Sequence, residues 1–203
     1  MKLENLETKF ETIYKQLSSE KFLQKKGLSG EIPFFISTYT PAQEHDVSQK
    51  IKTLINRLQI NGITALEINL YEISIDILKE RNLLEKIRST EKNMGKKKLF
   101  SALQNVLDSE KHLIPAIEKR IMQSDSDNQQ NDKIVLLTGV GAVFPFIRSH
   151  TVLNNLQNSI KDRPMLLFFP GIYDGHSLNL FGKMKDDNYY RAFNIKNYST
   201  EQG

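Results

Sequence analysis

The residues most suggestive of ligand chemistry are two glycines that follow a strand-like run. The run "KIVLLTGV" leads into Gly139 and Gly141, and a helix is expected beyond them, from about Pro145 to Ile160. A strand, a glycine turn and a helix form many phosphate-binding sites, because backbone N–H groups at the start of a helix can bind an anion. The first question is therefore whether this loop binds a nucleotide.

The glycine loop departs from both standard nucleotide motifs. It lacks the lysine with which a P-loop reaches the β- and γ-phosphates. Phe144 occupies the third-glycine position of the dinucleotide fingerprint, and Pro145 has no N–H to offer an anion. We predict a tight turn with Phe144 and Phe146 packed beneath it. The alternative is a partner surface or a degenerate phosphate site, in which Arg148, one turn into the helix, supplies the charge.

The histidines offer little catalytic or metal-binding chemistry. His150 falls at helical spacing with Phe146 and Leu153, which predicts a buried, hydrogen-bonded side chain. Asp174 and His176 form the one tight acid–histidine pairing, but Asp-Gly is typical of a turn. The chain has no cysteine, no histidine pair at metal-ligand spacing and no G-x-S-x-G elbow. We therefore predict no catalytic residue, no metal and no cofactor.

Composition indicates an ordinary globular protein of 203 residues, with 39% hydrophobic and 26% charged residues. A formal net charge of +4 is weak support for nucleic-acid contact. The N-terminus is charged throughout, and no uncharged apolar run approaches the roughly 18 residues that span a bilayer. We expect a cytoplasmic protein without a membrane segment.

The elements that position these residues are read from four apolar runs, "IPFFIS", "ITALEINL", "KIVLLTGV" and "MLLFFPG", and a last short strand, "YYRAFNI". The four runs show no clean alternation, which is typical of strands buried on both faces. We predict a single α/β domain over residues 1–203, with three layers and a mostly parallel sheet of about five strands between helices. Residues 71–132 should form a helical elaboration between strands two and three.

Other segments have simpler interpretations. Residues 1–20 predict an amphipathic N-terminal helix, and the polar residues 123–132 predict a mobile loop. Thr40 and Gln43 match a capping box at the start of the second helix. The basic cluster Lys92, Lys96, Lys97 and Lys98 is typical of a solvated helix start, although it could meet phosphates or an acidic partner surface.

Ligands of open parallel sheets bind beyond the carboxyl ends of the strands. The sheet prediction brings nine residues to that edge: Thr38, Tyr39, Asn69, Tyr71, Glu72, Gly139, Gly141, Asp174 and His176. Tyr190 lies in "KMKDDNYYRAF", which suits a recognition surface or an edge strand protected by charges. The predicted binding set, for a partner or an anion, is Gly139, Gly141, Arg148, His150, Asp174, His176 and Tyr190.

Several long strings resemble the BrxB family of bacterial BREX phage-defence systems. They are "GLSGEIPFFIS", "LEINLYEI", "LIPAIEKRI", "LLTGVGAVFPFIRSHTVLNNLQ" and "LLFFPGIYDGHSLNLFGKMKDDNYYRAF", and the resemblance runs from about Phe22 to Ile195. It implies a non-enzymatic adaptor in a cytoplasmic assembly, with a PglZ-type protein as direct partner. The BrxC ATPase and the PglX methyltransferase are further expected components. The family supplies no catalytic residues.

Two hypotheses therefore stand. The first is an adaptor that docks onto a PglZ-type protein or the ATPase, and a flat apolar patch with a polar rim would favour it. The second is a degenerate nucleotide- or nucleic-acid-binding module that uses the carboxyl edge of the sheet. A deep, positively lined pocket near Gly141 and Arg148 would favour the second. A hydrolase ranks below both, because nothing pairs a nucleophile with a base.

Overall fold

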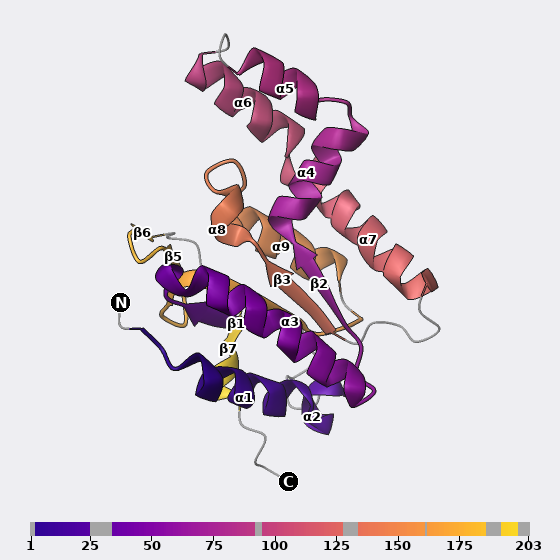
Figure 1. Cartoon of the computed structure of the whole chain (residues 1–203), viewed down its shortest axis with the longest axis vertical. Helices are drawn as coiled ribbons and strands as arrows, with labels where there is room; N and C mark the ends of the chain where they lie inside the picture. Colours follow the sequence, from indigo (N-terminus) through magenta and orange to yellow (C-terminus); the bar gives the residue numbers. More distant parts are fainter. Residues whose placement is uncertain are drawn as a thin grey trace.

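The computed structural model describes residues 3–24, 34–91, 95–127, 134–160, 162–185 and 192–198. In them a mostly parallel sheet lies between helices, which confirms the predicted α/β fold (Figure 1). The parallel strands run in the order β2-β3-β4-β1-β7, and a hairpin of β5 and β6 extends antiparallel from β4. The strands are β1 Phe34–Tyr39, β2 Ala65–Asn69, β3 Ile134–Thr138, β4 Met165–Tyr173, β5 Leu178–Leu180, β6 Met184–Lys185 and β7 Phe193–Asn194.

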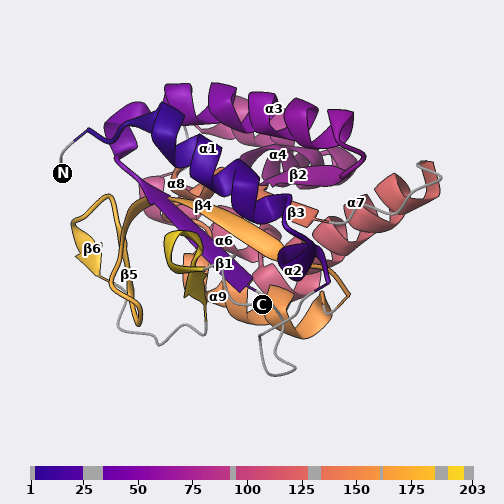
Figure 2. The same cartoon turned by 90° about the horizontal axis from the view of Figure 1, so that it is seen from below.

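The helices cover both faces of the sheet, with α1 and α3 on one side and α9 on the other (Figure 2). Short 3-10 turns occupy Pro41–Gln43 and Ile195–Asn197, and a π-helical turn occupies Ser109–Leu113. The α-helices are α1 Leu6–Leu17, α2 Glu20–Leu23, α3 Glu44–Ile60, α4 Leu70–Glu80, α5 Leu84–Thr90, α6 Lys96–Val106, α7 Ile114–Asp127, α8 Val140–Val143 and α9 Ser149–Ser159.

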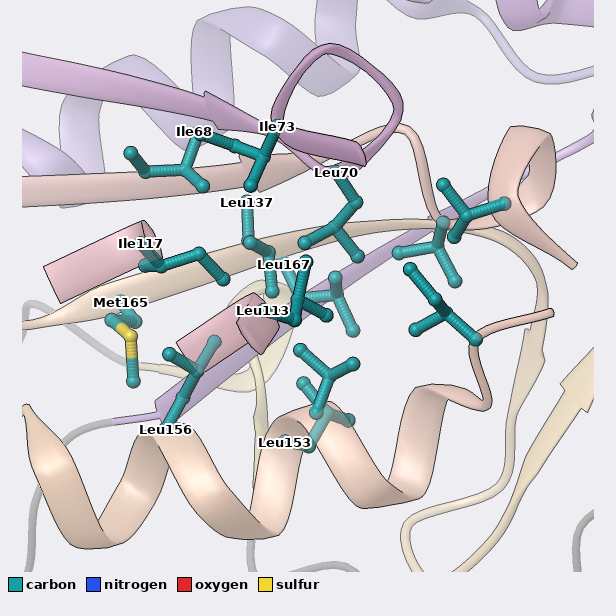
Figure 3. Close-up of a cluster of buried hydrophobic side chains, with 14 of the residues drawn as sticks. Ile68, Leu70, Ile73, Leu113, Ile117, Leu137, Leu153, Leu156, Met165 and Leu167 are labelled. Carbon is teal, nitrogen blue, oxygen red and sulfur yellow. The ribbon is translucent and has the colours of Figure 1, made fainter. Parts of the chain in front are cut away.

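Both faces of the central strands are buried, as the unbroken apolar runs predict. In β1, Phe34 and Ile36 join the core beneath α4, α7 and α9, whereas Phe35 and Tyr39 join the core beneath α1 and α3. Figure 3 shows the first of these cores, in which Leu153 and Leu156 of α9 approach the strands. Successive side chains of a strand point to opposite faces, so each strand contributes to both cores.

The predicted elaboration between β2 and β3 consists of helices with two different roles. Ile73 of α4 and Ile117 of α7 are buried against the sheet. By contrast, α5 and α6 extend away from the sheet beyond α4 (Figure 1). We call these two helices, residues 84–90 and 96–106, the helical arm.

The helix expected from Pro145 to Ile160 is wrong in its first part. Helix α8 ends at Val143, a cis peptide bond joins Phe144 to Pro145, and α9 begins only at Ser149. Phe144 is extended, with ψ at 140°, because a residue that precedes proline avoids helical backbone. Arg148 is also extended and is the N-cap of α9, not a residue one turn into the helix.

The predicted capping box at Thr40 is also absent. Thr40 makes no side-chain cap hydrogen bond, because residues 41–43 form a 3-10 turn before α3 starts at Glu44. Gln43 instead binds the N-terminal segment. Its Nε2 donates to the Glu4 carbonyl at 2.9 Å, and its Oε1 accepts from the Glu4 N–H at 3.0 Å.

The loop predicted at residues 123–132 is wrong for residues 123–127, which are helical. Helix α7 continues to Asp127, and the buried Arg163 donates to both carboxylate oxygens of Asp125 at 2.9 and 2.8 Å. This contact, 38 residues apart in the chain, helps to keep the polar segment helical. Residues 128–132 lie outside the described residues, as do residues 189–191 of the expected last strand.

The N-terminal helix is also shorter than the expected 1–20. Within the described residues α1 runs from Leu6 to Leu17, and Asn5 caps it by accepting from the Thr8 N–H at 3.2 Å.

Candidate functional site

The glycine loop is filled by side chains from neighbouring elements. Gly139 has a φ of +76°, and a Cβ at this position would lie 2.4 Å from Oδ1 of Asn69. That oxygen caps α4 by accepting from the N–H groups of Tyr71 and Glu72 at 3.0 and 3.3 Å. Asn69 can occupy this place because it ends β2 directly beside Thr138 of β3. Gly139 therefore permits close packing of two strand ends.

The second glycine is enclosed from the other side. A Cβ on Gly141 would lie 3.0 Å from atoms of Phe181 and of Pro170. Phe181 follows β5, and its N–H donates to the Pro170 carbonyl at 2.8 Å. The turn predicted for the glycines is present, but the ring against Gly141 belongs to Phe181 instead of Phe144 or Phe146. Both glycines are therefore packed so closely that neither position has room for a side chain.

Arg148 lies beside a small pocket. Its guanidinium is exposed, and it forms no ion pair with any described residue. The pocket holds about 170 Å³ and is lined by Phe144, Arg148, Ser149, Phe169, Leu178, Leu180 and Met184. Sites for drug-sized ligands enclose about 300–1,000 Å³. This pocket can therefore take one apolar side chain or a small anion, but it is too small for a nucleotide.

Asp174 and His176 form a turn. Asp174 Oδ1 accepts from the N–H groups of Ser177 and His176 at 2.7 and 2.9 Å, and Oδ2 accepts from the Ser177 hydroxyl at 2.8 Å. The hydrogen bonds from the Ser177 and His176 backbone lower the pKa of Asp174 to about 2. The ionised carboxylate thus closes the turn between β4 and β5, as Asp-Gly predicts.

The predicted burial of His150 is only partly correct. Its side chain is half-buried, in the first turn of α9, which starts at Ser149. The structure thus distributes the predicted set over three segments: Gly139 with Gly141, Arg148 with His150, and Asp174 with His176. Of these only Arg148 lines the pocket. Tyr190 lies outside the described residues.

Sequence reasoning missed a buried lysine at the carboxyl end of β1. Lys9 contacts the Thr38 carbonyl and the Glu4 carboxylate, and burial lowers the pKa of its amine. Partial burial raises the pKa of Glu4, but hydrogen bonds from Lys9 and Lys196 outweigh it and hold that pKa below its ordinary value. The available signal was spacing, since Lys9 falls three residues after Leu6 on the apolar side of α1.

Together these contacts fix the strand ends to their surroundings. Beside Lys9, the buried Tyr39 donates a 2.7 Å hydrogen bond to Glu44 in the first turn of α3.

Across the described ranges, no three His, Cys, Asp or Glu side chains gather to hold a metal ion. None of the described helices combines the length and the apolar character needed to cross a bilayer.

Comparisons with known proteins point to one family. A family model described as "BREX protein BrxB" matches residues 66–195. A protein of that name from Bacillus cereus (strain H3081.97) is 37% identical over 194 residues, which cover 95% of this chain and 98% of the relative. Another, from Escherichia coli O9:H4 (strain HS), is 31% identical over 190 residues, covering 94% and 91%. No solved structure matches.

Proposed function

This chain belongs to the BrxB family, and we propose that it acts as a non-enzymatic adaptor in a BREX phage-defence complex. Its direct partner in this proposal is a PglZ-type protein, within a cytoplasmic assembly that also contains the BrxC ATPase and the PglX methyltransferase. Nucleic acid is contacted through those components.

The observation that carries the proposal is the filled carboxyl edge of the sheet. An open parallel sheet normally binds its ligand there. In this chain Asn69, Pro170 and Phe181 occupy the space beside the two glycines. We therefore expect binding to occur on the outer surface of the domain, where a protein partner would dock. The family match supports the same conclusion, because residues 66–195 include every strand of the sheet except β1, together with the helical arm.

The Arg148 pocket favours a second candidate, a degenerate anion- or nucleic-acid-binding module. The exposed guanidinium stands at the N-terminus of α9, whose first turn contains no acidic residue. A phosphate or carboxylate group would be stabilised there. The pocket volume of about 170 Å³ supports the adaptor more strongly, since it leaves no room for a base and sugar.

Co-purification separates the two candidates. The chain is co-expressed with a tagged PglZ-type protein from the same gene neighbourhood, and the eluate is analysed by size-exclusion chromatography. The adaptor proposal predicts stable co-elution, which Tyr190→Ala or Arg148→Ala would weaken if those residues line the contact.

The matching control measures ATP and duplex DNA binding to the isolated chain by calorimetry. Co-elution without ATP or DNA binding supports the adaptor. Failure to co-elute, joined with ATP or DNA binding that Arg148→Ala abolishes, would contradict the adaptor and establish the anion-binding module.

A further inference from the structure

Helix α6 of the helical arm is amphipathic, yet none of its residues is buried. Leu99, Leu103 and Val106 recur at spacings of four and three, so they lie along one side of the helix. Their side chains are half-buried. An amphipathic helix is normally stabilised by burying this stripe against a core.

The arm is attached to the domain at one end of this stripe. Val106 packs against the core beneath α9, and Leu107, the next residue, is buried. The ring of Phe100 contacts that of Phe146, with centroids 5.6 Å apart. Leu99 and Leu103 belong to neither core among the described residues. A strip of apolar surface is therefore held in a defined position but is only half covered.

The first turn of α6 adds an unbalanced positive charge. Lys96, Lys97 and Lys98 are exposed, and none of them forms an ion pair with any described residue. The turn has no acidic residue. Because the N-terminus of a helix already carries a partial positive charge, three lysines there are unfavourable unless an anionic group is nearby.

We propose that the face of α6 formed by Lys96, Leu99 and Leu103 binds an acidic protein segment that also carries apolar side chains. Lys96 precedes Leu99 by three residues, so charge and apolar stripe lie on the same side of the helix. The acidic groups of the partner meet the lysines, and its apolar groups cover the leucines. This inference rests on the proposed function, because it takes the partner to be a protein.

Other occupants fit this face less well. A second copy of the chain would place the same lysines opposite one another, and like charges repel at close range. A nucleic acid would neutralise the lysines but leave Leu99 and Leu103 in water, since its outer surface is phosphate. Only an acidic amphipathic segment satisfies both halves of the face.

Two paired variants test the proposal with the intact chain and its PglZ-type partner. Lys96→Glu/Lys98→Glu reverses the charge on either side of the stripe, and Leu99→Asp/Leu103→Asp removes the apolar stripe. We expect each to weaken partner binding by about tenfold or more, as loss of a charged rim or of a central apolar contact does. Binding is measured by calorimetry at low and high salt, and wild-type affinity should fall as salt rises.

The controls are matched in chemistry and lie elsewhere. Lys52→Glu/Lys111→Glu reverses two exposed lysines outside the arm, and Leu3→Asp/Ile60→Asp places acids on two exposed apolar positions. Both should bind the partner within about twofold of wild type. All four variants should stay folded and unfold cooperatively on heating, because none of the substituted residues is buried.

The outcomes are distinguishable. If wild type binds the partner and the arm variants bind equally well, the arm proposal is overturned while the adaptor function stands. If wild type does not bind the partner at all, the adaptor function itself fails, and the arm proposal with it. If the lysine pair abolishes binding of duplex DNA while the leucine pair leaves partner binding intact, the face is a nucleic-acid surface and the proposal is wrong.

Discussion

The glycine loop and the helical arm differ in how completely their side chains are satisfied. At Gly139 and Gly141 the neighbours fit so closely that an added Cβ would lie 2.4 Å from Asn69 and 3.0 Å from Phe181. Along α6 the lysines have no ionic partner among the described residues and the leucines are only half covered. The comparison shows that glycines after a strand can indicate tight internal packing, whereas the half-covered stripe of an amphipathic helix is where we propose that a partner binds.

The strongest test of this contrast substitutes one glycine in each region. Gly139→Val should reduce the free energy of unfolding by about 4 kcal/mol, from a β-branched residue at positive φ and from displacement of the Asn69 cap. Gly95→Ala in the arm should change it by less than about 1 kcal/mol, because a Cβ there meets nothing within 4 Å. Urea unfolding measures both. Equal losses would show that the loop is not closely packed.

A second test compares two arginines. Arg163 is buried and donates to Asp125 and Asp162, and these hydrogen bonds raise its pKa. Arg163→Ala should cost about 3 kcal/mol, since it leaves Asp125 without its partner. Arg88→Ala in the arm removes an exposed pair with Glu85 and should cost less than about 0.5 kcal/mol. A small loss at Arg163, measured by thermal and urea unfolding, would mean that the end of α7 is held by other contacts.

A third test concerns the two helix starts. Asn69→Ala removes the side-chain cap of α4 and should cost about 1 kcal/mol. Helix α6 has Gly95 at N-cap without a side-chain bond, so Gly95→Asp should stabilise the chain by about 0.5 kcal/mol through capping and through charge opposite the lysines. Urea unfolding should show changes of opposite sign in the free energy of unfolding for the two variants. A destabilising Gly95→Asp would contradict the proposed charge imbalance of the arm.

The smallest effect is the pH dependence of the turn at Asp174. The folded pKa of Asp174, about 2, lies below the ordinary value of 3.8. The ionised carboxylate therefore contributes its full stabilisation above pH 3.8. This stabilisation is lost as pH falls through about 2. Proton titration of the Ser177 amide signal by NMR should therefore show a midpoint near 2, and Asp174→Asn should remove the transition. A midpoint near 3.8 would mean that the turn is open in solution.

The sheet was predictable because its physical cause is local. Strands buried on both faces must be apolar at every position, so "IVLL" in β3 and "MLLFF" in β4 predict the layers without reference to partners. The start of α9 was not predictable in this way. The helical spacing of Phe146, His150 and Leu153 extends the pattern back to Pro145, whereas the helix begins at Ser149. The end of α7 was hidden for another reason, since Asp125 is held by Arg163, a contact that no local pattern reveals.

The candidate site was less predictable than the fold. Sequence indicates that Gly139 permits a turn, but the identity of its neighbour depends on the register that places Asn69 beside Thr138. Likewise Phe181 reaches Gly141 only because the β5–β6 hairpin bends back over Pro170. The lysines at the start of α6, which form no ion pair with a described residue, are typical of an ordinary solvated helix start in the sequence. Their proposed role depends on the half-covered stripe beside them.

The contact between Glu4 and Lys196 has a consequence for the order of folding. Their carboxylate and amine are 3.0 Å apart although 192 residues separate them, and Gln16 also donates to the Tyr198 carbonyl at 2.9 Å. Closing so long a loop costs more conformational entropy than any shorter contact in the chain. Helix α1 and the 3-10 turn Ile195–Asn197 should therefore come into contact late in folding, after the sheet against which they pack has formed.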